Sequence, residues 1–316
     1  MFEVDVKSKW NEDVCILLKV ANHPFFYMID CGEAKSLSVK ECIQTNALFI
    51  SHTHIDHFSN FDKILRSQIG IGRRVVICGP KGITSQIQNR IKSYTWNLIS
   101  SISISYEIRE IINDKRYQST LLQPPLWEMQ QQKIIQADYL FEERDFKVCY
   151  TSLDHKTPSI AYLFEGNERI NMQITPNLKA GKWIGDLKEA FLSDEPNREI
   201  VIEEKSYKAS DLFQHLKRER GEKFGFILDH AANKANHELI KKTFSNADKI
   251  WIECYYKDQD KSYAKQNYHS YLSQSVSVMK AAKVKKAIPI HFSRKYSRQE
   301  INDMIDTFES LSKKDT

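Results

Sequence analysis

Apolar residues along this chain occur in short runs that end in a polar residue, a pattern typical of buried strands in an α/β protein. Residues 25–30 and 47–50 are two such runs, and 101–111 alternates apolar and polar positions as a half-buried strand does. We expect further strands at 74–78, 146–155, 159–166, 224–230, 247–256 and 287–296. The spacing of apolar residues predicts helices at 57–68, 83–94, 269–283 and 297–314.

Side chains that can bind metal ions or carry protons lie where these strands end. They are Asp30, His52, His155, Asp229, Glu253 and His291. Because α/β proteins build their sites from strand ends at one edge of a sheet, we expect these side chains to share a site.

Composition narrows the class of protein without naming an activity. Of 316 residues, 41% are hydrophobic and 28% are charged, as in a protein with a real core and a solvated surface. No apolar run approaches the ~20 residues that span a bilayer, and no secretory signal is visible at the start. The six cysteines form no CxxC pair, which favours a reducing, cytoplasmic location. The net charge of +5 is only mildly favourable for a polyanionic ligand.

One segment interrupts the regular alternation of strands and helices. Residues 166–220 are less regular, and we interpret them as an insertion within a single domain that spans 1–316. Its charged end, HLKRERGEK at 215–223, is interpreted as the solvated face of a helix.

The densest chemistry lies in SHTHIDHFSN, residues 51–60. Alternation along an extended backbone points His52 and His54 the same way, and two imidazoles on one side suit zinc or a similar transition metal. Asp56 and His57 follow the turn and can face a second ion. Four ligands cannot complete two coordination shells, so the site needs further strand-end ligands. His155, Asp229 and His291 meet that need.

These motifs resemble the metallo-β-lactamase superfamily and, within it, ribonuclease Z, the tRNA 3′-end endonuclease family. SHTHIDH matches the HxHxDH signature of the superfamily. The segments that resemble ribonuclease Z are MIDCGE at 28–33, CGPKGI at 78–83, LDHKTPSIAYLFE at 153–165 and IPIHFSRKY at 288–296. With gaps, the similarity runs from about Phe25 to Tyr296.

The resemblance implies a four-layer αββα sandwich with two zinc ions, or manganese, in a cleft at one edge of the paired sheets. One ion would be held by His52, His54 and His155, the other by Asp56, His57 and His291, with Asp229 bridging both. Water held by two metal ions loses a proton near neutral pH, and the metal-bound hydroxide would attack the phosphorus of a phosphodiester.

The same resemblance assigns catalytic roles to side chains around the metals. Asp56 would also orient the hydroxide, and His269 would donate a proton to the leaving oxygen. Glu253 would orient His269, and Asp30 would support the metal ligands from behind. Ser293 and Arg294 are candidates for contact with a substrate phosphate, although Arg294 is equally well explained as a surface charge.

Departures from the family pattern limit what the resemblance implies about substrate. The usual first loop, which contacts the tRNA acceptor end, is shortened or lost. The long tRNA-binding arm is not evident, which leaves 166–220 as the place for at most a reduced version. FSN at 58–60 stands where relatives carry a glycine, and His230 stands where they carry a small hydroxyl residue. We expect His230 not to bind metal.

Three functions therefore stay open at this point. The favoured one is a di-zinc phosphodiesterase or endoribonuclease of ribonuclease Z type acting on pre-tRNA or another phosphodiester. A second is a hydrolase of a small ester, lactone or thioester, and a third is a binding module without turnover. The intact set of seven ligands argues against the third. A homodimer is implied by the resemblance, but less strongly without a clear arm.

Overall fold

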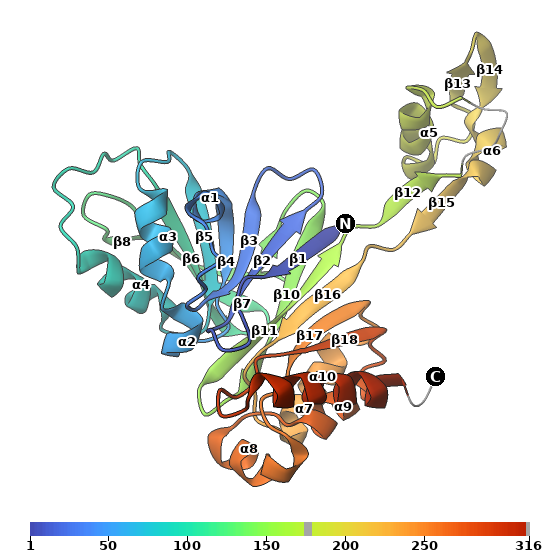
Figure 1. Cartoon of the computed structure of the whole chain (residues 1–316). Coiled ribbons are helices and arrows are strands. Elements are labelled where there is room, and N and C mark those ends of the chain that lie inside the picture. Colours follow the sequence, from blue (N-terminus) through green and yellow to red (C-terminus); the bar gives the residue numbers. More distant parts are fainter. Residues whose placement is uncertain (174–178, 314–316) are drawn as a thin grey trace. The chain divides into compact units, whose positions relative to one another are not determined.

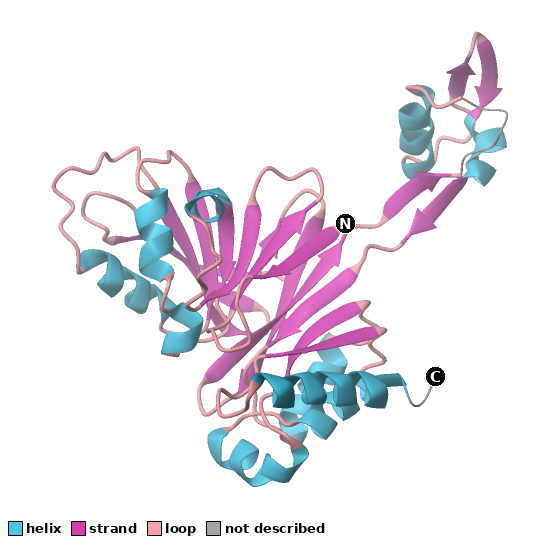
Figure 2. Cartoon of the chain, in the orientation of Figure 1, coloured by secondary structure: helices cyan, strands magenta, loops and turns pink. Residues whose placement is uncertain are grey.

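Two β-sheets pack face to face in the main part of this computed structural model, which describes residues 1–173 and 179–313 (Figure 2). The first sheet has eight strands in the order β1-β2-β3-β4-β5-β6-β7-β8. They are β1 Phe2–Val6, β2 Cys15–Val20, β3 Phe26–Cys31, β4 Thr45–Phe49, β5 Arg74–Gly79, β6 Ser105–Asn113, β7 Arg116–Leu122 and β8 Met129–Gln136. The four consecutive strands from β3 to β6 are parallel, as expected for strands joined by helices.

The second sheet has the order β18-β17-β16-β11-β10-β9. Its strands are β9 Phe141–Glu142, β10 Phe146–Asp154, β11 Pro158–Gly166, β16 Lys223–Ile227, β17 Lys249–Glu253 and β18 Lys286–Ile290. The strands β16, β17 and β18 run parallel, so their carboxyl ends meet at one edge and bring Asp229, Glu253 and His291 together.

Helices cover the outer faces of both sheets (Figure 1). The helices on the first sheet are α1 Val39–Gln44, α2 Ile55–Phe58, α3 Phe61–Gln68 and α4 Ile83–Lys92. The second sheet is followed by α7 Lys234–Thr243, α8 Lys261–Asn267, α9 Leu272–Ala281 and α10 Arg298–Lys313, with the short η2 Asp258–Asp260 before α8. The last residue of the helix expected at 297–314 lies outside the described residues.

Three apolar cores hold these layers together. Phe49, Phe146 and Phe164 belong to the core between the sheets, where the ring of Phe164 contacts Phe49 edge-on and Phe146 at a tilt. A second core joins the first sheet to α3 and α4, and a third joins the second sheet to α7, α9 and α10. The sequence-based expectation of an αββα sandwich is therefore confirmed.

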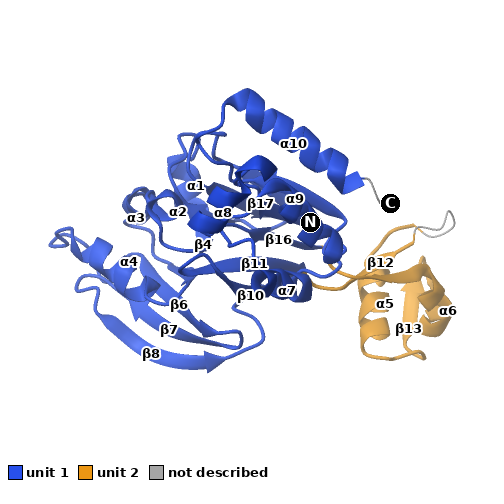
Figure 3. Cartoon of the chain, turned by 90° about the horizontal axis from the view of Figure 1, so that it is seen from below, with its two compact units in different colours: residues 1–165, 223–316 blue, residues 166–222 orange. Residues whose placement is uncertain are grey.

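Residues 166–222 form a second compact unit with its own small core (Figure 3). Its strands are β12 Arg169–Met172, β13 Glu199–Ile202, β14 Lys205–Lys208 and β15 Leu216–Glu219, and its helices are α5 Trp183–Leu192, α6 Ala209–Leu212 and η1 Phe213–His215. Trp183, Leu187 and Ile200 are buried together with four other apolar residues. The expectation of a helix across 215–223 is wrong, because Leu216–Glu219 pairs with β12 as a strand.

A glycine is required at position 32, where the turn after β3 meets the histidine-rich loop at 51–60. A Cβ atom on Gly32 would lie 1.9 Å from the carbonyl oxygen of Asp56. The turn after β3 therefore touches the backbone of the histidine-rich loop, and only glycine allows that approach. Within the described residues, no helix is long and apolar enough to cross a membrane.

Candidate metal centre and catalytic site

The histidine-rich loop begins where β4 ends and runs into the one-turn helix α2. His54 is the N-cap residue of α2, so the backbone is extended before it and helical after it. His52 and His57 are fully buried on either side of this change, while His54 is exposed. Because the backbone changes from extended to helical at His54, His52 and His54 fall in one group of possible ligands, and Asp56 and His57 fall in another.

Asp229 lies at the centre of the cluster, with its two carboxylate oxygens facing different histidines. Its Oδ2 is 3.8 Å from His52 Nε2 and 3.4 Å from His155 Nε2. Its Oδ1 is 3.3 Å from His57 Nε2 and 2.7 Å from His291 Nδ1. This division matches the arrangement needed by a carboxylate that bridges two metal positions.

Groups of possible ligand atoms within 4.8 Å of one another reproduce both expected sets. The first set is His52, His54 and His155, and the second is Asp56, His57 and His291. Asp229 also groups with members of both sets, and once with His269. The structure thus brings all seven expected ligands together, although they come from four separate segments of the chain.

In the absence of a metal ion, protons on two histidines of this cluster balance the negative charge of Asp229. Burial opposes a charge on His291, but Asp229 outweighs it and raises the pKa of His291 to about 9. Burial likewise opposes a charge on His57, and Asp229 and Asp30 raise its pKa well above the usual range. Protons on these imidazoles therefore balance Asp229, whose pKa lies well below its usual range despite burial.

Two buried polar atoms of this cluster, His57 Nε2 and Asp229 Oδ1, make no hydrogen bond of normal geometry with the described residues, although they lie 3.3 Å apart and His291 Nδ1 is 2.7 Å from Asp229 Oδ1. Unpartnered buried polar atoms are uncommon, and an ion is one explanation for them. Imidazole nitrogens with carboxylate oxygens are the donors that zinc and similar transition metals prefer. The residues fit a metal cofactor.

Asp30 orients two of the histidines from behind. Its Oδ2 accepts hydrogen bonds from His57 Nδ1 and from the Ser51 hydroxyl, both at 2.6 Å. The Ser51 hydroxyl oxygen is in turn 3.1 Å from His52 Nδ1. Both rings thereby turn Nε2 toward the cluster, a common arrangement behind metal ligands, and His52 Nε2 lies 2.9 Å from His54 Nδ1 there. Asp30 (φ 50°) and His291 (φ 55°) both have left-handed backbones, which are strained for residues other than glycine.

His269 and Glu253 form a hydrogen-bonded pair beside Asp229. His269 Nδ1 donates to Glu253 Oε1 at 2.6 Å and lies 3.8 Å from Asp229 Oδ2. Glu253 is fully buried and also accepts from the backbone N–H of Ser270 at 2.8 Å. Burial opposes a charge on His269, but Glu253 outweighs it and raises the His269 pKa. His269 can therefore hold a proton beside the expected metal ligands.

Tyr255 contacts this pair and was not identified from the sequence. Its ring is stacked on His269 with a centroid distance of 3.8 Å and an interplanar angle of 5°. Its position two residues beyond Glu253, just after a strand end, is the only signal in the sequence that could have indicated it.

The remaining candidates lie around the cluster. His230 is buried, its Nδ1 donates to the Leu228 carbonyl at 2.8 Å, and it belongs to none of the groups of possible ligands among the described residues. Arg294 forms an ion pair with Asp13. Ser293 is buried, and its N–H donates to the Tyr255 carbonyl at 3.0 Å. Phosphate binding by Ser293 and Arg294 stays a prediction.

Asn60, in the FSN stretch that departs from the family pattern, ties the loop to β3. Its N–H donates to the Cys31 carbonyl at 2.7 Å, and its side chain donates to the Gly32 carbonyl at 2.9 Å. The departure at FSN therefore keeps the loop in place.

Comparison with known proteins agrees with the fold. No family model matches the chain. Ribonuclease Z of Borreliella afzelii is 28% identical over 295 residues, which cover 88% of this chain and 80% of the relative. The metallo-β-lactamase fold protein YhfI of Bacillus subtilis has a TM-score of 0.58 at 12% identity, covering 97% of this chain and 92% of YhfI. Human tRNase Z, short form, has a TM-score of 0.58 at 16% identity, covering 94% of each chain.

The sandwich of this chain has the metallo-β-lactamase fold, and its histidine–aspartate cluster together with the ribonuclease Z relatives supports a metal-dependent hydrolase. Within that fold, its sequence resembles ribonuclease Z over nearly its whole length.

Proposed function

We propose that this protein is a two-zinc phosphodiesterase and endoribonuclease of ribonuclease Z type that acts in the cytoplasm on pre-tRNA. The observation that carries the proposal is the placement of the His269–Glu253 pair next to Asp229. Hydrolysis of a phosphodiester leaves an alkoxide, a poor leaving group that gains from a proton donor. A pair of this kind has little purpose in a protein that only binds a ligand.

Each part of the site would have a distinct task. His52, His54 and His155 would hold one ion, Asp56, His57 and His291 the other, with Asp229 between them. When bound, the ions would lower the pKa of water and stabilise negative charge on the phosphoryl oxygens.

The chain's own side chains would do the remaining work. Asp56 would accept a hydrogen bond from the attacking water and aim it. His269 would deliver its proton from Nε2 to the leaving oxygen, while Glu253 holds Nδ1 and keeps the ring in place. Asp30 would hold His57 and, through Ser51, His52.

The charge of the unit formed by residues 166–222 bears on whether the protein binds RNA. The unit formed by residues 166–222 carries ten Lys and Arg residues and eleven Asp and Glu residues, so it is not a strongly basic surface. RNA binding generally needs cationic side chains for the phosphates. The similarity to ribonuclease Z and to tRNase Z is the main support for pre-tRNA as the substrate.

The decisive experiment compares three substrates with the zinc-loaded protein. They are a pre-tRNA with a 3′ trailer, a chromogenic phosphodiester and a lactone. Trailer cleavage at one position supports the proposal, and turnover of the lactone alone overturns it in favour of a small-ester hydrolase. A homodimer belongs to the same proposal, and light scattering on the purified protein tests it.

A further inference from the structure

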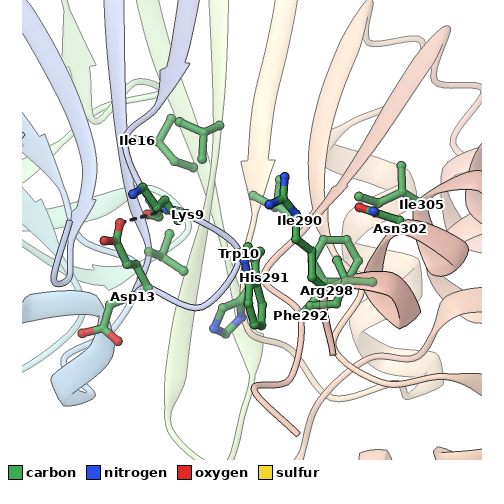
Figure 4. A pocket seen from close by; sticks show the side chains of 15 residues that line it. Lys9, Trp10, Asp13, Ile16, Ile290, His291, Phe292, Arg298, Asn302 and Ile305 are labelled. Carbon is green, nitrogen blue, oxygen red and sulfur yellow. Dashed lines mark hydrogen bonds between the residues drawn. The ribbon is translucent and has the colours of Figure 1, made fainter. Parts of the chain in front are cut away.

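A pocket of about 560 Å³ adjoins the histidine–aspartate cluster at His291 (Figure 4). Its walls are the loop before β2, the end of β18 and the first turns of α10. His291, an expected metal ligand, lines this pocket, so the pocket and the cluster share a residue. The volume lies within the ~300–1,000 Å³ typical of sites for small ligands.

The lining of this pocket combines flat apolar surface with uncommitted positive charge. Trp10 and Phe292 contribute rings, and Trp10 is 41% exposed, so part of its indole is open to a ligand. Lys9 and Arg298 also line the pocket, and neither has an ion-pair partner in residues 1–173 and 179–313.

Of the two acidic residues of the lining, Asp13 is ion-paired with Arg294. Glu12 keeps its negative charge and accepts a hydrogen bond from the backbone N–H of Lys9 at 3.0 Å. With Asp13 neutralised, Lys9 and Arg298 outnumber Glu12, so the charge that faces a ligand is positive on balance. Positive charge beside an exposed indole suits a molecule that joins a planar ring to a phosphate.

We propose that this cavity, the Trp10 pocket, is a subsite for the nucleoside phosphate next to the scissile phosphodiester. The base stacks on Trp10, and a neighbouring phosphate lies near Lys9 and Arg298. The inference rests on the proposed function, because a scissile phosphate at the metal cluster is what places an adjacent nucleoside at His291. Stacking on an aromatic side chain is tolerant of base identity, so the subsite should accept any base.

Equilibrium binding to the zinc-loaded protein tests this subsite without turnover. The probes are adenosine 5′-monophosphate and ribose 5-phosphate, which differ only in the base. We expect Trp10→Ala to raise the Kd of adenosine 5′-monophosphate about tenfold, equivalent to about 1.4 kcal/mol. Trp10→Phe should recover most of the affinity, and ribose 5-phosphate should bind all three proteins equally. Tyr94→Ala, which removes an exposed ring that does not line the pocket, should change neither Kd.

Two further binding measurements test the role of the cations and distinguish a free nucleotide from a nucleotide within RNA. Lys9→Gln combined with Arg298→Gln should weaken both probes. A single-stranded tetraribonucleotide that shows the same dependence on Trp10 indicates a nucleotide within RNA, and one that does not bind indicates a free nucleotide.

An unchanged Kd of adenosine 5′-monophosphate in Trp10→Ala overturns the subsite, as does an equal loss for ribose 5-phosphate. Because no hydrolysis is measured, a failure to cleave phosphodiesters counts against the proposed function and leaves this result standing.

Discussion

The ring of Tyr255 lies flat on the imidazole of His269, with centroids 3.8 Å apart and planes within 5° of parallel. Glu253 holds the edge of the same imidazole through a 2.6 Å hydrogen bond to Nδ1. The hydrogen bond to Glu253 limits rotation of the imidazole in its own plane, and the stacked ring of Tyr255 limits tilting of the imidazole out of that plane. Together they leave Nε2 as the free atom of His269.

Replacing Tyr255 should therefore affect proton delivery to a poor leaving group. An aromatic contact contributes about 0.5–1.5 kcal/mol, so we expect Tyr255→Leu to lower kcat between about two- and tenfold on a diester with an alkyl leaving group. Turnover of a nitrophenyl diester, whose leaving group needs no proton, should change little. Tyr255→Phe keeps the ring and should retain activity on both.

The stacking itself can be observed apart from catalysis. The ring protons of His269 should shift in NMR spectra of Tyr255→Leu because the ring current of Tyr255 is lost. Tyr263→Leu, a change at an exposed tyrosine, serves as the control. Equal kcat values for wild type and Tyr255→Leu on both diesters would show that the stacking has no role in catalysis.

His269→Ala should lower kcat on the alkyl diester by about 10²–10⁴, the usual contribution of a positioned general acid. The zinc content should stay as in wild type, because His269 is assigned as a proton donor and not as a metal ligand. His269 also falls in one group with His155 and Asp229, so this outcome is informative. Loss of an ion in His269→Ala, measured by elemental analysis, would make His269 a ligand.

Much of this site follows from the sequence because it is encoded locally. The HxHxDH spacing sets four ligands within six residues, and the others directly follow strands whose apolar runs are plain. The αββα layers follow for the same reason. By contrast, strands β7 and β8 have no clear apolar run, and most of β8 is exposed on both faces. Antiparallel pairing with β6 holds β7 in the sheet, and pairing with β7 holds β8. No apolar run in the sequence marks these two strands.

The roles of Tyr255 and Arg294 could not be predicted for a related reason. A tyrosine after a strand looks the same whether it stacks on a catalytic histidine or faces solvent. The ion pair of Arg294 with Asp13 joins residues 281 positions apart in the chain. Only the fold decides whether that guanidinium is free for a phosphate.

Binding of zinc should release protons, in a manner that depends on pH. Asp229 raises the pKa of His291 to about 9, so His291 carries a proton in the metal-free protein at pH 7 and must lose it to bind a metal. The release from His291 is therefore expected below pH 9 and should vanish above it. Calorimetric titrations with zinc in buffers of different ionisation enthalpy measure the number of protons released. Equal release at pH 7 and pH 10 would contradict this assignment.

Asp229 and Asp30 are both buried carboxylates, but their replacement should have different effects. Asp30→Asn removes support from behind the ligands and should weaken zinc binding by about 10–100-fold, the usual effect of such a change. Asp229→Asn removes the bridge itself, and we expect it to abolish detectable turnover of a chromogenic phosphodiester. Zinc titrations and rates at saturating zinc separate the two effects. Full activity of Asp229→Asn at saturating zinc would remove Asp229 from the site.

The unit formed by residues 166–222 can be removed to test which substrates need it. It emerges between β11 and β16, which are antiparallel neighbours with Glu165 opposite Lys223. The N–H of Gly166 donates to the Glu222 carbonyl at 2.9 Å, so a two-residue Asn-Gly turn in place of 167–221 should close the hairpin. Because every expected metal ligand lies outside this unit, hydrolysis of a chromogenic diester should be unchanged.

Pre-tRNA makes a different demand on the shortened protein. A large substrate gains affinity from contacts beyond the cleft, and this unit is where a reduced tRNA-binding arm would lie. We expect the excision to lower kcat/KM for pre-tRNA by more than about tenfold, a loss of at least about 1.4 kcal/mol in binding. The thermal unfolding midpoint of the shortened chain controls for damage to the sandwich. Pre-tRNA cleavage at the full rate, with an intact fold, would mean that the substrate is held by the sandwich alone.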